Sequence, residues 1–387
     1  MMKDNGTYCP LIFNEIYADS SGEYRLCCHA KSSPVSQKYK SQTHKPFDYF
    51  LSPEMEDIRD KVLSGKKLDE CITCYKQEEV NPMGESYRQR KVRQHRIQLP
   101  TYVDKVNLKL RINGSYCNLS CYMCIPYNSS TRRNEMKKIY PKGWDFFSKS
   151  KYMPVKHNEY ELIVNDILDN IEKVQEIHIT GGEPLQLPNH WKLIDRIPKE
   201  HAKNIRLVYD TNLTQLRYKN HSVYDVEDKF KQVNWGVSCD HYQDRLSWIR
   251  YPINVKEFES NLKEIIDANF YAYLNCTISL LNIFDLDKID DYYMKKFNIN
   301  INFNSIVTTP RFLSIKHLPY KIKQNLIKKY DDMARTDRRG IDKFQLVKTE
   351  LKLDGDESKL NEAYDYMDKL SKNRNFDWRT LWPDFLK

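Results

Sequence analysis

Short segments of strand character alternate with longer helical segments in the part of the chain that follows residue 100. Six segments have strand character, and they begin near residues 106, 176, 205, 233, 272 and 299. Between them, residues 158–173 place apolar side chains on one helical face, and Phe258, Leu262 and Ile265 do the same later in the chain. This order is typical of βα units and predicts an α/β fold.

Several of these strands alternate almost strictly between apolar and polar residues. Val106 and Leu108 alternate with Asn107 and Lys109, and residues 233–240 repeat the pattern. A fully packed parallel barrel would have apolar residues on both faces of its strands. A polar face therefore favours an open barrel, in which helices cover the apolar face and the polar face lines a lumen large enough for a cofactor.

The regions that flank the βα region differ from it in composition and period. Residues 1–85 have little long-range periodicity and hold five of the ten cysteines. Residues 86–104 form a basic connector. We therefore expect four parts: a cysteine-rich module in 1–85, the connector in 86–104, the barrel in 105–310 and a C-terminal extension in 311–387.

The extension is expected to be helical. Leu326 and Tyr330 belong to a set of apolar residues at helical spacing, and a second, charged helix is expected near 356–372. Residues 132–157, which include Pro141 and Gly143, interrupt the first βα crossover and indicate an insertion or lid.

Three cysteines stand close together in the stretch C-N-L-S-C-Y-M-C, where Cys117, Cys121 and Cys124 have the spacing C-x3-C-x2-C. A zinc site or an electron-transfer cluster normally closes its shell with four protein ligands. A compact group of three thiolates suggests instead a [4Fe-4S] cluster with one iron open to a small molecule.

This arrangement resembles the signature of the radical S-adenosylmethionine (SAM) superfamily, in which the amino and carboxylate groups of SAM chelate the open iron. Gly181, Gly182, Glu183 and Pro184 look like the GGE motif of that family, whose backbone meets the SAM amino group. They follow a short strand, at the carboxyl end where α/β sheets bind ligands, and glycine lets backbone approach a ligand closely. The resemblance implies a partial (β/α)6 barrel of the TIM type.

Other positions resemble further SAM contacts of the family, namely Met123, Thr211, Asn212, Ser238, Asp240 and Arg250. Thr211 and Asn212 look like the start of the family's TNG motif, with Leu213 in place of the glycine. Ser238 and Asp240 resemble an S-x-D motif that approaches the ribose and methionyl parts of SAM. The guanidinium of Arg250 suits a carboxylate, and the Met123 thioether can pack against adenine where an aromatic residue is usual.

The N-terminal cysteines form a second group, Cys9, Cys27, Cys71 and Cys74, with the pattern C-x12-G-x4-C followed by C-x2-C. This pattern resembles the twitch, or half-SPASM, module, which holds an auxiliary [4Fe-4S] cluster. That module usually follows the barrel, whereas here it precedes it. The neighbouring Cys28 leaves the second ligand open, and the G-x4-C spacing favours Cys27.

A zinc site or a set of extracellular disulfides would also use cysteines in such numbers. C-x2-C pairs are common in zinc sites, and ligand type alone does not separate zinc from iron and sulfur. Disulfides are disfavoured, because the polar N-terminus lacks a signal peptide and the chain has no apolar run long enough to span a bilayer. We therefore expect a cytoplasmic protein with no membrane partner. Cys239 and Cys276 are expected to be buried core thiols.

The positive net charge of the chain leaves open a role in nucleic-acid binding. The net charge is +9, and Arg88, Arg90 and Lys91 belong to a basic stretch in the connector that could contact phosphates or an acidic peptide. A solvated helix is the simpler interpretation, because no base-reading motif accompanies the charges. Lys109 and His178, on the polar strand face, could contact substrate or be polar wall residues.

The resemblance implies an enzyme that cleaves SAM reductively to a 5′-deoxyadenosyl radical, which abstracts hydrogen from a substrate. The partners that it implies are a reductant such as flavodoxin or ferredoxin and a peptide or protein side chain as substrate, because auxiliary-cluster relatives often modify peptides. Modification of RNA or a nucleotide is one alternative. The other is a non-catalytic binding module stabilised by zinc, for which both cysteine groups would be structural.

Overall fold

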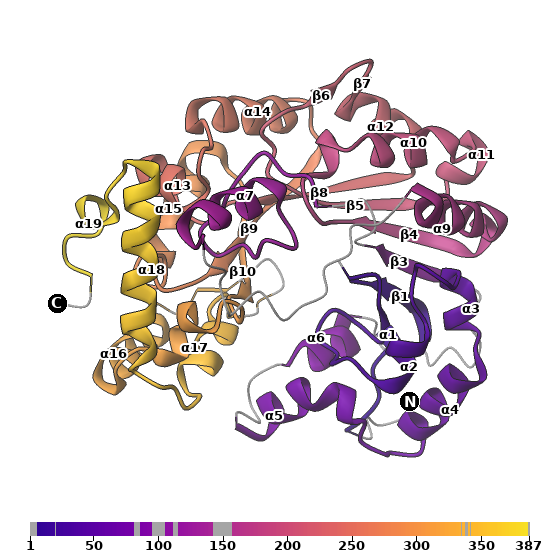
Figure 1. Cartoon of the computed structure of the whole chain (residues 1–387), viewed down its shortest axis with the longest axis horizontal. Helices are drawn as coiled ribbons and strands as arrows, with labels where there is room; N and C mark the ends of the chain where they lie inside the picture. The colour runs from indigo at the N-terminus through magenta and orange to yellow at the C-terminus, as the bar shows by residue number, and fades with distance from the viewer. Residues whose placement is uncertain are drawn as a thin grey trace. The chain divides into compact units, whose positions relative to one another are not determined.

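The structure is a computed structural model, and it describes residues 6–19, 21–80, 86–94, 105–110, 115–141, 157–333, 335–336, 340 and 342–385. Contacts between Cα atoms divide the chain into two compact units. The first unit comprises residues 1–114, 151–210 and 217–234, and the second comprises residues 115–150, 211–216 and 235–387. Figure 1 shows the elements in the order of the chain.

The expected α/β fold with an open, partial barrel sheet is confirmed, and the sheet has eight strands. All six predicted strands are present: β3 (Val106–Leu110), β4 (Val174–Ile179), β5 (Arg206–Thr211), β8 (Gln232–Ser238), β9 (Tyr271–Ile278) and β10 (Ile301–Ile306). Two further strands, β1 (Glu15–Ala18) and β2 (Tyr24–Arg25), come from the N-terminal cysteine-rich region. The strand order is β5-β4-β3-β1-β2 in the first unit and β10-β9-β8 in the second.

Strand β1 extends the parallel sheet of the first unit, an addition that the hydrophobic pattern did not predict. Glu15 pairs in register with Asn107, and Tyr17 with Lys109, whose own partner on β4 is His178. Strand β2 runs antiparallel to β1. Because residues in register on parallel strands share a face, the polar face predicted for β3 and β4 continues onto β1.

The other elements of the first unit are α1 (Leu11–Asn14), α2 (Pro34–Lys38), α3 (Pro46–Phe50), α4 (Pro53–Leu63), η1 (Asp69–Cys71), α5 (Ile72–Val80), α6 (Tyr87–Gln94), α9 (His157–Asp169), η2 (Ile171–Lys173), η3 (Pro184–Gln186), α10 (Pro188–Arg196), α11 (Lys199–Ala202), β6 (Arg217–Tyr218), β7 (His221–Ser222) and α12 (Val223–Lys229). The apolar face predicted for 158–173 is confirmed, since Tyr160, Ile163 and Ile167 in α9 are fully buried.

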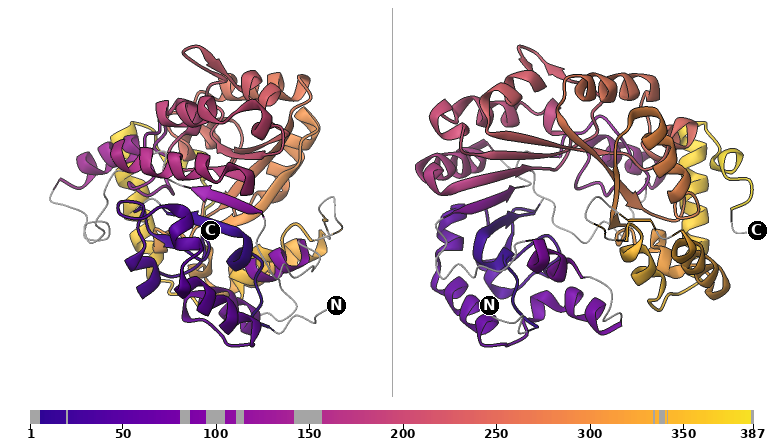
Figure 2. Two further views of the ribbon diagram at one scale, coloured as in Figure 1. Left: turned by 90° about the vertical axis from the view of Figure 1, so that its right-hand side faces the viewer. Right: turned by 180° about the vertical axis from the view of Figure 1, so that it is seen from behind.

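The other elements of the second unit are α7 (Ser130–Ile139), α13 (Gln243–Ile249), α14 (Val255–Asp267), α15 (Leu286–Phe297), η4 (Arg311–Leu313), η5 (Ile315–His317), α16 (Tyr320–Asp332), α17 (Gln345–Leu351), α18 (Lys359–Arg374) and α19 (Trp378–Leu381). The helical extension is thus confirmed. Helix α17 packs against β10, and Figure 2 shows from two further sides how α16, α17 and α18 gather at the same end of this unit.

The basic connector contains helix α6, in which one predicted solvent-facing arginine has an internal role. Arg88 is only 4% exposed. It forms an ion pair with Glu78 at 2.8 Å and donates a hydrogen bond to the backbone oxygen of Tyr8 at 2.9 Å. Arg88 therefore ties α6 to the cysteine-rich region, while Arg96 and the rest of the connector lie outside the described residues.

The segment predicted as an insertion or lid begins with a regular helix. Helix α7 covers its first residues, whereas 142–156, with Gly143 and Trp144, lie outside the described part of the chain. Among the helices that are described, none has the length and the apolar character that crossing a membrane requires.

Candidate functional site

The three cysteines of the C-x3-C-x2-C motif lie on one loop of the second unit. We call residues 117–124 the cysteine loop. Cys117 is buried, Cys121 and Cys124 are half-buried, and none of the three forms a disulfide. The backbone nitrogen of Ser120 donates to the oxygen of Tyr251 at 2.6 Å, and that of Tyr122 to the oxygen of Ile249 at 2.8 Å. The loop is therefore anchored on the end of helix α13.

Hydrogen-bond donors approach two of the three sulfur atoms. The amide nitrogen of Leu119 lies 3.5 Å from the sulfur of Cys117, and the side-chain nitrogen of Asn212 lies 3.8 Å from it. The Nη1 atom of Arg250 lies 3.9 Å from the sulfur of Cys121. Donors of this kind favour thiolates and are among the groups that tune iron-sulfur clusters.

The electrostatic surroundings of Cys121 act in two directions. Burial raises the pKa of this thiol, while Arg250, Arg374 and Arg132 each lower it. Burial has the larger effect, so the pKa lies above its ordinary value. A cationic metal centre would supply the further positive charge that a thiolate needs at this position.

Asn212 connects the end of β5 to the cysteine loop. Its side-chain nitrogen donates to Oδ1 of Asn118 at 2.9 Å, and its own Oδ1 accepts from the backbone of Thr214 at 3.0 Å. The hydroxyl of Thr211 accepts from the nitrogen of Leu213 at 3.0 Å. Leu213 has a φ of 52°, in the left-handed region that glycine favours. The backbone of the TNG-like segment is thus left-handed although leucine replaces glycine.

Asp240 and Arg250 form a buried ion pair. The Nε atom of Arg250 lies 2.7 Å from Oδ2 of Asp240, which is fully buried. Oδ1 of Asp240 accepts from the backbone of Thr277 at 2.6 Å. Burial alone would lower the pKa of Arg250, but Asp240 and Cys121 raise it above its ordinary value. The two predicted SAM contacts therefore hold each other in place. Met123 is buried and Ser238 half-buried.

The GGEP segment belongs to the first unit and follows β4, as predicted. Gly181 and Gly182 have φ values of 92° and 58°, so both adopt backbone conformations that side chains disfavour. The carboxylate of Glu183 accepts from the nitrogen of Leu185 at 3.2 Å and caps η3, whose first residue is Pro184. The glycines and the cap together produce a sharp turn at the carboxyl end of the strand.

All five N-terminal cysteines interact electrostatically, and Cys28 is the thiol with the largest effect on Cys27. Burial raises the pKa of Cys9, and repulsion by Cys71 and Cys74 raises it further. The pKa of Cys71 rises to about 12, first through burial and then through Cys74. Cys27 interacts in the same way with Cys9. Mutual repulsion between thiolates is the condition that a bound metal centre relieves.

Cys28 has different surroundings from Cys27. Lys109 on β3 lies 3.9 Å from its sulfur. Burial raises the pKa of Cys28, but Lys109 and His29 outweigh burial and lower it. Cys28 thus has a cation as a partner, whereas Cys27 faces other thiols. The choice of Cys27 over Cys28 as a ligand stays a prediction from the G-x4-C spacing.

The donor chemistry of both groups fits iron-sulfur ligation. Each offers free thiols, three in the cysteine loop and four in the N-terminal group. Within the described ranges, no three Cys, His, Asp or Glu side chains are arranged to hold a single metal ion. In a [4Fe-4S] cluster each thiolate binds its own iron. Of the three remaining cysteines, Cys28 lies beside Lys109, and Cys239 and Cys276 are fully buried in the second unit, as predicted.

A comparison with protein-family models found a match over a range that includes the cysteine loop. Residues 114–294 match the family model of the Radical SAM superfamily. No curated protein matches the chain.

Solved structures resemble part of the chain. One is described as native anSMEcpe with bound AdoMet, with 17% identity and a TM-score of 0.41 over 58% of this chain and 60% of that one. Another is TYW1 with a lysine-pyruvate adduct bound, with 16% identity and a TM-score of 0.32 over 56% and 70% of the two chains. The chain thus spans about 60% of the length of the anSMEcpe structure.

Sequence reasoning missed one set of residues beside the cysteine loop, namely Arg132, Glu135 and Arg374. All three are buried. The first two fall in the segment interpreted as an insertion and the third in the C-terminal extension. A pair of charges at i and i+3 in an otherwise ordinary helix gives no sign that both are buried, so the sequence carries no clear signal for them.

Proposed function

We propose that this chain is a radical SAM enzyme in which Cys117, Cys121 and Cys124 hold a [4Fe-4S] cluster. When bound there, the cluster supplies the electron that cleaves SAM to methionine and a 5′-deoxyadenosyl radical, which abstracts hydrogen from the substrate. The observation that carries the proposal is that three cysteines outside any disulfide, with donors near two of their sulfurs, lie inside the range that matches the Radical SAM superfamily.

The protein's own contribution is to hold the loop and to orient SAM. Asn212 fixes Cys117 against the end of β5, and Arg250 joins Cys121 to Asp240. We propose that the SAM contacts are Met123, Gly181, Gly182, Glu183, Pro184, Thr211, Asn212, Ser238, Asp240 and Arg250. We propose that backbone groups at the turn of the two glycines bind the amino group of SAM and that the protein keeps water away from the radical.

For the N-terminal group we propose a second [4Fe-4S] cluster on Cys9, Cys27, Cys71 and Cys74. The mutual repulsion of these thiols and the separate pairing of Cys28 with Lys109 support this ligand set. The resemblance to the twitch module supports a peptide or protein side chain as the substrate and flavodoxin or ferredoxin as the reductant. We place RNA second, because Arg88 in the basic connector is engaged internally.

Elemental analysis of protein purified without oxygen tests both clusters together. We expect about eight irons and eight sulfides per chain, the sum for two [4Fe-4S] clusters. About four irons with one zinc would retain the radical enzyme and make the N-terminal site structural. Zinc without iron would favour the binding module and contradict the proposal. Cys276→Ala, which changes a buried thiol outside both groups, should keep the wild-type content.

A further inference from the structure

A buried ionic cluster joins the C-terminal helix α18 to the cysteine loop within the second unit. Its members are Arg132 and Glu135 on α7 and Arg374, the last residue of α18, and their side chains are 0%, 6% and 0% exposed. Arg374 holds Glu135 through two contacts, Nε to Oε1 at 2.7 Å and Nη2 to Oε2 at 3.0 Å. Arg132 pairs with the same carboxylate.

The two guanidinium groups also donate to backbone oxygens of the cysteine loop. Arg132 donates to the oxygen of Tyr122 through Nη2 and to that of Cys124 through Nε, both at 3.2 Å. Arg374 donates through Nη2 to the oxygen of Ser120. The peptide group that precedes Cys121, the one between Tyr122 and Met123, and the one that follows Cys124 are therefore held from outside the loop.

Three more contacts complete the attachment. The hydroxyl of Tyr366, two turns before Arg374 in α18, donates to the oxygen of Tyr122, and the hydroxyl of Ser120 donates to Glu135. Arg374 also donates to the oxygen of Trp248 at 2.8 Å, in the helix that anchors the loop. Oxygens from three alternate loop residues, 120, 122 and 124, thus each have a donor.

Packing alone does not require this cluster. Helix α18 already buries Leu360, Met367 and Leu370, which suffice to dock an amphipathic helix. Buried charges are costly unless they are paired and hydrogen-bonded, and an apolar replacement is often as stable. A fully satisfied polar network instead fixes one conformation of the groups that it contacts. Here those groups are backbone oxygens of the cysteine loop.

We infer that helix α18 positions the cysteine loop, and that Arg374 is its principal positioning residue. The inference rests on the proposed function for the identity of the bound cluster. By fixing the oxygens on either side of Cys121, the network sets the directions in which the Cys121 and Cys124 thiols point. The C-terminal extension therefore contributes to cluster geometry although none of its residues is a ligand.

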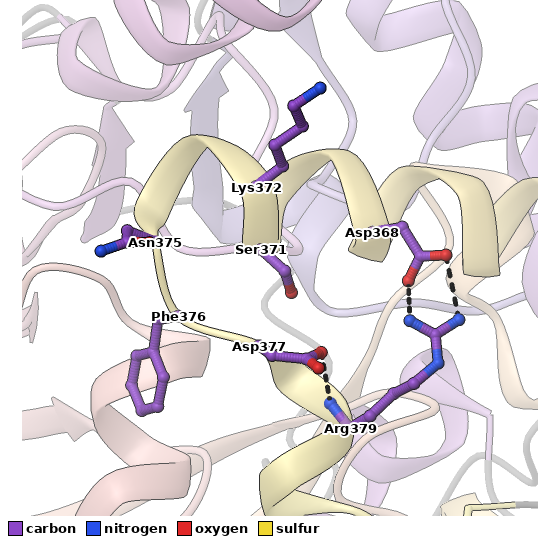
Figure 3. Close-up of a pocket in the computed structure, with 7 residues that line it drawn as sticks. All are labelled: Asp368, Ser371, Lys372, Asn375, Phe376, Asp377 and Arg379. Carbon is purple, nitrogen blue, oxygen red and sulfur yellow. Dashed lines mark hydrogen bonds and ion pairs between the residues drawn. The ribbon is translucent and has the colours of Figure 1, made fainter.

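The test compares Arg374→Met with Arg379→Met. Arg379 lies on α19, in the same C-terminal segment, and pairs with Asp368 at the surface (Figure 3). We expect Arg374→Met to lower cluster retention or SAM cleavage roughly 10- to 100-fold, as loss of outer partners of metal ligands does. We also expect an altered electron paramagnetic resonance signal of the reduced cluster, with and without SAM. Arg379→Met should match the wild type in each measurement.

Milder variants keep the inference testable if Arg374→Met does not fold. Tyr366→Phe removes one hydroxyl and should shift the signal while preserving the melting temperature, and Arg374→Lys should recover part of the wild-type signal. If Tyr366→Phe and the Arg374 variants that fold all give the electron paramagnetic resonance signal of the wild type, the inference is overturned. The proposed function would still stand in that case. A wild type without any SAM-sensitive cluster signal would overturn the proposed function and the inference with it.

Discussion

The guanidinium of Arg250 lies 3.9 Å from the sulfur of Cys121, a residue that precedes it by 129 positions. The same guanidinium is paired with the buried Asp240 at 2.7 Å. One cation thus serves a thiol and a carboxylate at once, and this links the end of β8 to the cysteine loop. The loop is held by contacts that lie far apart in the sequence.

Arg250→Met should destabilise the protein, because it leaves Asp240 buried without its cation. Breaking a buried pair from one side costs roughly 3–5 kcal/mol. Urea denaturation should therefore show a lower free energy of unfolding, and Arg250→Met combined with Asp240→Asn should recover part of the loss. With Asp240→Asn measured alone as well, single-variant losses that simply add in the double variant would mean that the pair contributes no coupling.

Asn212→Ala should affect the cluster more than the fold. The substitution removes the donor to the sulfur of Cys117 and the contact with Asn118. We expect a shifted reduction potential and SAM cleavage lowered roughly tenfold, by analogy with other outer partners of metal ligands. Asn204→Ala, at an exposed turn, is the matched control. A potential identical to that of the wild type would show that Asn212 does not act on the sulfur.

The low pKa of Glu135 leads us to predict that the stability of the protein depends on pH in the acidic range. Burial raises its pKa, but Arg374 and Arg132 outweigh burial and lower it from 4.5 to about 2. A depressed pKa contributes stability above pH 4.5 that is lost as the pH falls toward 2. At about 1.4 kcal/mol per pKa unit the contribution is roughly 3 kcal/mol. Glu135→Gln should lose this slope in denaturation curves between pH 5 and pH 2.5, and a slope as steep as that of the wild type would contradict the account.

Leu213→Gly should lower stability even though it relieves backbone strain. The left-handed conformation of Leu213 costs roughly 1–2 kcal/mol relative to glycine. Its side chain is fully buried, and removing a buried leucine costs roughly 2–5 kcal/mol. The two ranges give a net loss of roughly 0–4 kcal/mol, centred near 2 kcal/mol, which thermal or urea denaturation can measure. A more stable Leu213→Gly variant would show that strain outweighs packing at this position.

The features that could be predicted from the sequence are those that depend on the local spacing of apolar residues. The six barrel strands and the buried faces of α9 and α14 follow from alternation and helical spacing. The addition of β1 to the sheet did not follow, because register between strands distant in sequence depends on tertiary packing. Arg374 contacts Ser120 across 254 positions, and Arg88 is buried rather than solvated. Charged residues look exposed in a sequence until their partners are known.

The measurement that tests the central claim most directly is the formation of 5′-deoxyadenosine from SAM by anaerobically reduced protein. The account predicts product from the wild type and from Cys276→Ala, and none from Cys117→Ala, Cys121→Ala or Cys124→Ala. Product formation that persists in any of the three loop variants, or an iron-loaded wild type that forms none, would contradict it.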